Sequence, residues 1–142
     1  MTVHINDGYA WLGNGTDYLK VFCEHILWIP VTGPELEHYE GGVSFGVDLS
    51  KFFLVIKLQG IWLNTNTKYE NYMTYMKSWQ QSNTLQIEIQ RNIGGTKLKI
   101  DGTNTILPVL AMKGFGEFEK MPGDQDKYRA NEVVLEQRGT AS

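Results

Sequence analysis

The stretch Phe52-Phe-Leu-Val-Ile-Lys-Leu-Gln-Gly-Ile-Trp-Leu63 decides the fold class, because its apolar residues continue through a full strand length. Successive side chains of a β-strand point to opposite faces of the sheet. One face, which we assign to the core, therefore carries Phe52, Leu54, Ile56, Leu58, Gly60 and Trp62. The other face is only partly polar, so we expect a neighbouring element or another subunit to cover its apolar members, Phe53, Val55, Ile61 and Leu63.

An amphipathic helix is predicted over residues 67–82. Thr67 and Glu70 have the spacing of a capping box, in which each side chain satisfies a free amide of the first turn. Apolar side chains then recur at intervals of three and four, and we assign them to the core: Tyr69, Tyr72, Met73, Met76 and Trp79. Such a stripe can line a ligand groove, but core packing is the simpler interpretation.

The rest of the chain indicates strands and turns. Residues 85–90 and 96–100 alternate around an Asn92-Ile-Gly-Gly turn, which predicts a β-hairpin. Many short strands with one helix favour a mainly β fold of the α+β class. We expect an antiparallel β-sandwich or partly closed barrel with one flanking α-helix. Residues 1–142 should form a single domain, with 138–142 as a frayed tail.

Composition restricts the partners. The chain has 13 Lys and Arg against 16 Asp and Glu, a formal charge of −3, so specific nucleic-acid binding is not expected. No run of apolar residues is long enough to span a membrane, and no signal segment is recognisable, so we expect no membrane contact. Cys23 is the only cysteine and is expected to be a reduced, partly buried thiol that serves in packing.

No catalytic constellation is recognisable, so we expect a protein that is not an enzyme and that uses no cofactor. His4, His25 and His38 are far apart and do not have the spacing of metal ligands, so no metal site is predicted. Trp11 and Trp28 are not assigned by periodicity. They stay open as surfaces on which a sugar ring could stack.

The segment between residues 32 and 42 is the best candidate for an extended loop, because glycine, proline and charged residues bury little surface. Together with the second face of the 52–63 strand, it is our candidate inter-subunit contact. The residues that we expect to take part are Thr32, Pro34, Glu35, Leu36, Tyr39 and Gly41.

One resemblance supports an assembly role. The order of strand, helix, hairpin and edge strand is followed by Lys113-Gly-Phe-Gly-Glu-Phe-Glu-Lys-Met-Pro-Gly-Asp-Gln-Asp-Lys-Tyr128 and a last strand ending Val-Leu-Glu-Gln137. This layout, over residues 43–137, is similar to the tail-tube and distal-tail superfamily of bacteriophages and archaeal tailed viruses. The resemblance implies rings, usually sixfold, whose joined sheets line a channel, and a loop that reaches the neighbouring subunit. The superfamily has no catalytic residues to carry over.

The leading hypothesis is therefore a structural subunit of a virus tail, either a tail-tube or a ring-adaptor protein. It would form a homo-oligomer of hexameric rings, contact other tail proteins, be assembled in the host cytoplasm and reside in the virion. The alternative is a small-ligand or carbohydrate-binding β-barrel module that uses Trp11 and Trp28. A ligand-binding module would be monomeric and have a concave aromatic pocket, whereas a tail subunit would associate through a sheet edge or face.

Overall fold

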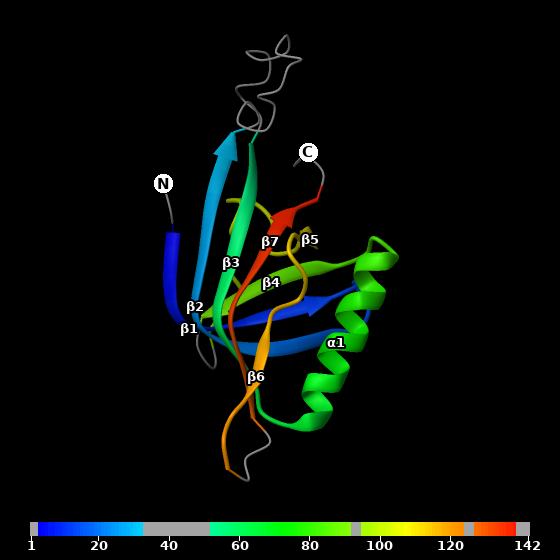
Figure 1. Ribbon diagram of the computed structural model, residues 1–142. Coiled ribbons are helices and arrows are strands. Elements are labelled where there is room, and N and C mark those ends of the chain that lie inside the picture. Colours follow the sequence, from blue (N-terminus) through cyan, green and yellow to red (C-terminus); the bar gives the residue numbers. More distant parts are fainter. Residues whose placement is uncertain (1–2, 33–51, 92–94, 124–126, 139–142) are drawn as a thin grey trace, which may run out of the picture.

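The computed structural model describes residues 3–32, 52–91, 95–123 and 127–138 (Figure 1). The elements, in chain order, are β1 (Val3–Gly13), β2 (Tyr18–Thr32), β3 (Phe52–Leu63), α1 (Asn66–Gln81), β4 (Gln86–Arg91), β5 (Leu107–Ala111), β6 (Phe118–Lys120) and β7 (Tyr128–Gln137).

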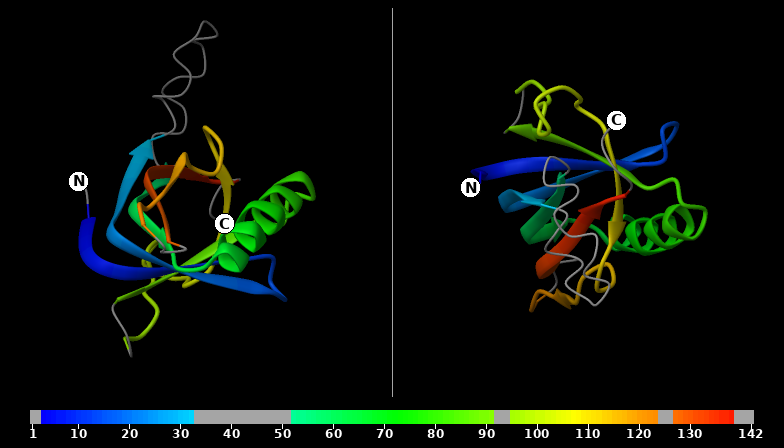
Figure 2. Two further views of the ribbon diagram at one scale, coloured as in Figure 1. Left: turned by 60° about the horizontal axis from the view of Figure 1, so that its bottom comes forward. Right: turned by 90° about the horizontal axis from the view of Figure 1, so that it is seen from above.

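The strands form one antiparallel sheet that closes on itself. The order β3-β2-β1-β4-β5-β7 returns to its start because β7 also pairs with β3, and β6 pairs with the beginning of β7. Figure 2 shows the resulting ring of strands end-on. The predicted mainly β fold with one flanking helix is thus confirmed, in the form of a barrel.

The barrel interior is filled with side chains. Residues from β1, β2, β3, β4, β5 and β7 contribute to one buried cluster, and its largest fully buried strand residues are Leu12, Ile26, Ile56, Leu58, Ile61, Ile87, Ile89, Leu107 and Leu135. Small antiparallel barrels fill their interior in this way.

The prediction that β3 keeps one inward face along its whole length is wrong. Leu54, Ile56 and Leu58 are buried, but after Gly60 the buried residues are Ile61 and Leu63, while Trp62 is half-buried. The alternation shifts by one residue at Gly60, whose φ of +63° lies in the left-handed region that glycine adopts without a steric penalty. Ile61 and Leu63 therefore lie in the core of their own subunit, and Trp62 lies on the outer face.

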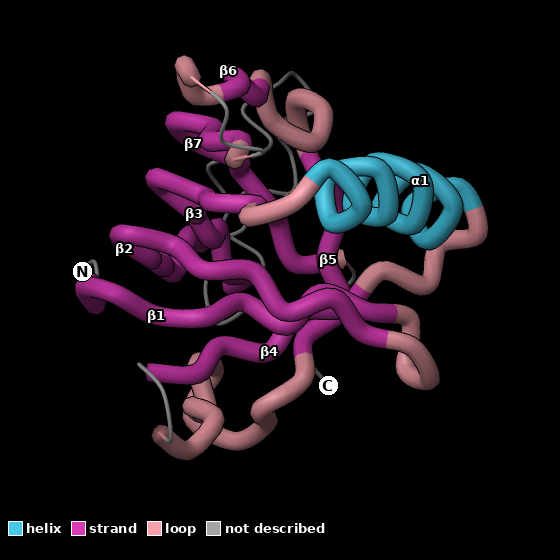
Figure 3. The backbone as a smooth tube through the Cα atoms, turned by 90° about the horizontal axis from the view of Figure 1, so that it is seen from below, coloured by secondary structure: helices cyan, strands magenta, loops and turns pink. Residues whose placement is uncertain are grey.

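Helix α1 lies against the barrel on the side of β5 and β6 (Figure 3). Tyr72, Met76 and Trp79 are buried, and Tyr69 and Met73 pack partly against the core. The predicted capping box is wrong: the N-cap is Thr65, whose hydroxyl accepts a hydrogen bond from the backbone N–H of Lys68 at 3.0 Å.

Two polar contacts fix the helix in place. The Gln80 side-chain amide makes two bonds with the backbone of Ala111, accepting from its N–H at 2.7 Å and donating to its carbonyl at 3.1 Å. The Tyr72 hydroxyl donates to the Phe115 carbonyl at 2.8 Å, so this buried hydroxyl is satisfied. These bonds attach the helix to the end of β5 and to the segment between β5 and β6.

The predicted hairpin of residues 85–100 forms only in part. Its first strand is β4, but the returning segment pairs through a single bridge between Gln90 and Lys97, with a Leu98 N–H to Ile89 carbonyl bond at 2.8 Å. The reason is that β5 occupies the same edge of β4 at Gln86 and Ile87. Residues 96–100 can reach only the other end of that edge.

Candidate functional site

Four strands share one irregularity on the outer face of the barrel. Asp7, Glu24, Gly60 and Asn131 lie opposite one another in the registers of β1, β2, β3 and β7, yet none of the four forms a regular ladder pair. At each of these four positions, two consecutive residues of the strand face outward. The alternation of inward and outward residues therefore shifts by one residue in all four strands, at the same height along the barrel. Asp7 and Gly60 adopt positive φ there, at 53° and 63°. Such irregularities let strands bend while staying paired.

Gly60 leaves room for a side chain to cross β3. A Cβ atom at this position would lie 2.5 Å from the Glu24 Cδ atom and 2.6 Å from its Oε1 atom. Because glycine has no Cβ, the Glu24 carboxylate can extend from β2 over β3 toward β7. The glycine is therefore required both by its backbone conformation and by the close approach of Glu24.

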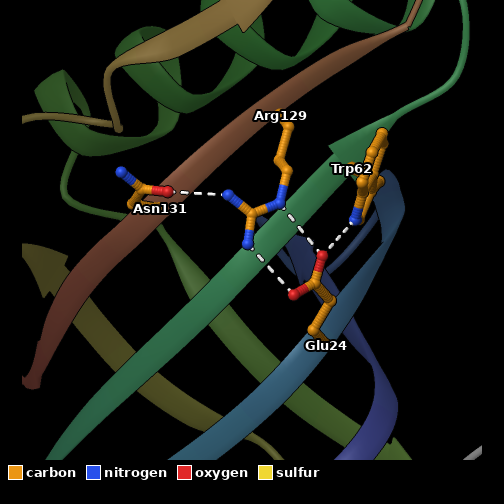
Figure 4. A network of polar contacts seen from close by, with 4 residues as sticks. All are labelled: Glu24, Trp62, Arg129 and Asn131. Carbon is orange, nitrogen blue, oxygen red and sulfur yellow. Dashed lines mark hydrogen bonds and ion pairs between the residues drawn. The ribbon is translucent and has the colours of Figure 1, made fainter. Parts of the chain in front are cut away.

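The Glu24 carboxylate is the centre of a four-residue network (Figure 4). Arg129 on β7 donates to it twice, from Nε to Oε2 and from Nη2 to Oε1, both at 3.0 Å. The indole N–H of Trp62 donates to Oε2 at 2.7 Å, and Arg129 Nη1 donates to Asn131 Oδ1 at 2.7 Å. Side chains from β2, β3 and β7 are thus joined by charge-assisted bonds.

These donors change the acidity of Glu24. The hydrogen bonds from Arg129 and then from Trp62 lower the pKa of the Glu24 carboxyl to about 2. The side chain remains about one-third exposed, with a relative accessibility of 33%. A carboxylate held ionised and bonded on two sides is a positioned anion rather than a general base, so the network orders the outer face of the sheet.

An aromatic row lies beside the Glu24 network. Tyr9, Phe22 and Trp62 are directly opposite one another on β1, β2 and β3, and Arg129 follows Trp62 on β7. The Tyr9 and Phe22 rings meet edge to face at 5.6 Å, and the Arg129 guanidinium lies 5.9 Å from the Trp62 ring centre. Because the row depends on the register of four strands, it is not visible in the sequence.

The residues of the predicted interface do not all lie on one face of the structure. Phe53 and Val55 stay on the outer face, half-buried, where each lies opposite an apolar residue of β2: Val31 and Ile29. Ile61 and Leu63 are removed from the interface by the phase change at Gly60. Thr32 is the last residue of β2. The other predicted contacts, Pro34, Glu35, Leu36, Tyr39 and Gly41, lie outside the described residues.

The tryptophans proposed for sugar stacking are both engaged. Trp28 is 7% exposed and belongs to the core. Trp11 is half-buried, donates its indole N–H to Gln90 Oε1 at 2.9 Å, and has the ammonium groups of Lys97 and Lys20 at 4.6 Å and 5.1 Å from its ring. This pair of rings does not form a sugar platform.

Two histidines that are distant in sequence meet on the outer face. His4 Nε2 lies 3.1 Å from His25 Nδ1, which also lies 2.9 Å from Asn6 Oδ1. The antiparallel register of β1 and β2 brings them together. His38 lies outside the described residues. Among the residues that the structure describes, no group of three or more His, Cys, Asp or Glu is arranged to hold a metal ion.

The Cys23 thiol and the Tyr72 hydroxyl are enclosed in the core. Cys23 is fully buried, and this burial raises the pKa of its thiol, as it raises that of the Tyr72 hydroxyl. A buried neutral thiol is a poor nucleophile. Within the described part of the chain, no helix has the length and apolar character needed to cross a membrane.

Comparison of the chain with models of protein families, with curated proteins and with solved structures finds no match.

Proposed function

We propose that this protein is a structural subunit that associates with copies of itself through the outer face of the β2–β3 hairpin, as the ring-forming subunits of virus tails do. The observation that carries the proposal is the apolar character of that outer face. Val31 and Phe53 are directly opposed, as are Ile29 and Val55, while the neighbouring β3 residues Leu54 and Ile56 are already buried in the core. Outward positions of an antiparallel sheet are usually polar.

Neighbouring residues extend this face. Leu27 on β2 and Val134 on β7 flank Lys57 of β3 in register and are half-buried. A stable contact buries about 800 Å² on each partner, which is more than these side chains alone offer. We therefore include the strand ends and the segment that follows Thr32, with Pro34, Glu35, Leu36, Tyr39 and Gly41, in the proposed contact.

A ring follows if the contact is head-to-tail. When one surface of a subunit meets a different surface of the next, the assembly closes where the rotation between neighbours allows it. The similarity in element order to tail-tube and distal-tail proteins favours a hexameric ring in a virion, with other tail proteins above and below. In this role the subunit performs no catalysis and needs no cofactor.

The interior packing argues against the alternative of a ligand held inside the barrel. The side chains of six strands fill this space, so a small molecule would have to bind on the outside.

Light scattering after size-exclusion chromatography tests the proposal. We expect the full chain to elute at a multiple of 16.2 kDa and the Val55→Glu variant to elute as a folded monomer. Ile106→Glu is the matched control, because Ile106 is 41% exposed and lies just before the end of β5 that pairs with β4, so its variant should keep the wild-type mass. A monomeric wild type at millimolar concentration, or an unchanged oligomer in Val55→Glu, would refute the proposal. Electron microscopy of the oligomer then distinguishes rings from dimers.

A further inference from the structure

A groove of about 570 Å³ lies on the outer face of the barrel, where β1, β2 and β3 approach the first turn of α1. Its floor is the aromatic row Tyr9, Phe22 and Trp62, and its cations are Lys20, Lys68 and Lys127. None of the described residues that line it is an aspartate or a glutamate. The groove therefore combines aromatic surface with positive charge.

The aromatic floor is continuous across three strands. Tyr9 is opposite Phe22, and Phe22 is opposite Trp62. Neighbouring strands are about 4.8 Å apart, so the row is about 10 Å long. The bond from Trp62 to Glu24 holds the indole in place at one end. Rings held in this way lose little conformational freedom when a planar group stacks on them.

The cations stand at the two ends of this floor. The Lys20 ammonium lies 4.3 Å from the centre of the Tyr9 ring, at the β1 end. Lys68 lies in the first turn of α1 and Lys127 immediately precedes β7, at the β3 end. In the described part of the chain, no ion pair engages any of the three. The first turn of α1 also carries no acidic residue, so the helix dipole adds to the positive potential there.

We propose that this groove binds single-stranded nucleic acid without sequence preference. Bases would stack along the aromatic row while phosphates contact the lysines, which is the chemistry of non-specific single-strand binding. Cations at opposite ends suit successive phosphates of a chain better than the one phosphate cluster of a free nucleotide. A duplex is disfavoured because its bases are already stacked on one another.

The net charge of −3 does not oppose this binding. Exposed charges farther away than about 8 Å are largely screened at physiological salt. The Glu24 carboxylate, which accepts a bond from Trp62 of the groove, is already paired with Arg129. Stacking and phosphate contacts do not distinguish one base from another, so binding in this groove would be unspecific. Such binding agrees with the expectation that the protein does not recognise a specific sequence.

Fluorescence anisotropy of a labelled oligothymidylate, titrated with the full chain at several salt concentrations, tests the proposal. Each phosphate contact to a single strand contributes about 0.7 to the slope of log K against log salt, so three lysines predict a slope of about −2. The double variant Lys68→Glu/Lys127→Glu should bring the slope to about −0.7 and weaken binding. The matched control Lys99→Glu/Lys113→Glu changes the same total charge at exposed sites outside the groove and should keep the wild-type slope.

The stacking part has its own readout. Tyr9→Leu and Phe22→Leu should each weaken oligothymidylate binding by about fivefold or more, while circular dichroism melts show that the variants are folded. Binding that is absent at millimolar protein, or equally weakened by the control pair, overturns the proposal. Inorganic polyphosphate has no bases, so the proposal is also overturned if polyphosphate competes as well as unlabelled oligothymidylate does. Competition by ADP at the same concentration would indicate a nucleotide pocket instead of a strand groove and would also overturn it.

Discussion

Replacing Gly60 with alanine is the sharpest test of the network on the outer face. The new Cβ would have to occupy a point 2.5 Å from the Glu24 Cδ atom and 2.8 Å from its Cβ atom. The carboxylate must therefore move away, and the bonds from Arg129 and Trp62 are lost with it. The alanine must also adopt a φ of +63° or force β3 to rearrange.

Two terms give the expected magnitude. An L-residue with a side chain in the left-handed region costs about 1–2 kcal/mol. The Glu24 side chain is one-third exposed, so we discount its ion pair and hydrogen bonds for solvent screening to about 1 kcal/mol. The sum is about 2–3 kcal/mol, which lowers the melting temperature of a domain of this size by about 10 °C.

Differential scanning calorimetry of Gly60→Ala beside Gly102→Ala measures the difference. Gly102 has a φ of +88°, and no atom lies within 4 Å of the point that its Cβ would take. Its alanine variant should therefore lose stability only through the unfavourable backbone conformation. We expect Gly60→Ala to melt several degrees below Gly102→Ala, and this gap to narrow when Glu24→Ala is present in both. Equal melting temperatures for the two single variants would show that Glu24 does not depend on Gly60.

Three further outcomes are expected. Met76→Asp should abolish cooperative thermal unfolding, because Met76 is 0% exposed and an unpaired buried carboxylate costs several kcal/mol; a near-native melting transition would contradict this. The pKa of Glu24 falls from 4.5 to about 2 on folding, so the stability that its carboxylate contributes is present above pH 4.5 and is lost as the pH falls toward 2. The difference in unfolding free energy between wild type and Glu24→Gln, measured in urea, should therefore shrink over that range. Cys23 should react slowly with a thiol reagent in native buffer and fast in urea, and equal rates would refute its burial.

The sequence by itself determined the mainly β class, the central strand and the helix. Alternation in residues 52–58, and the apolar stripe from Tyr69 to Trp79, depend on local periodicity, so the strand and the helix could be predicted without knowing their partners. The N-cap was misplaced by two residues, because both Thr65 and Thr67 have the chemistry of an N-cap and only the path from β3 decides between them.

The outer-face sites depended on the tertiary structure. A glycine within a strand pattern does signal a bulge or a close approach, and Gly60 could have been interpreted in that way. The sequence does not show that Glu24 would cross it, or that Tyr9, Phe22 and Trp62 would form a row, because these contacts join residues 13 to 105 positions apart. Local pattern fixes which residues alternate, whereas the register between distant strands fixes which side chains meet. A single-residue change of phase at Gly60 moved Ile61 and Leu63 into the core and Trp62 out of it.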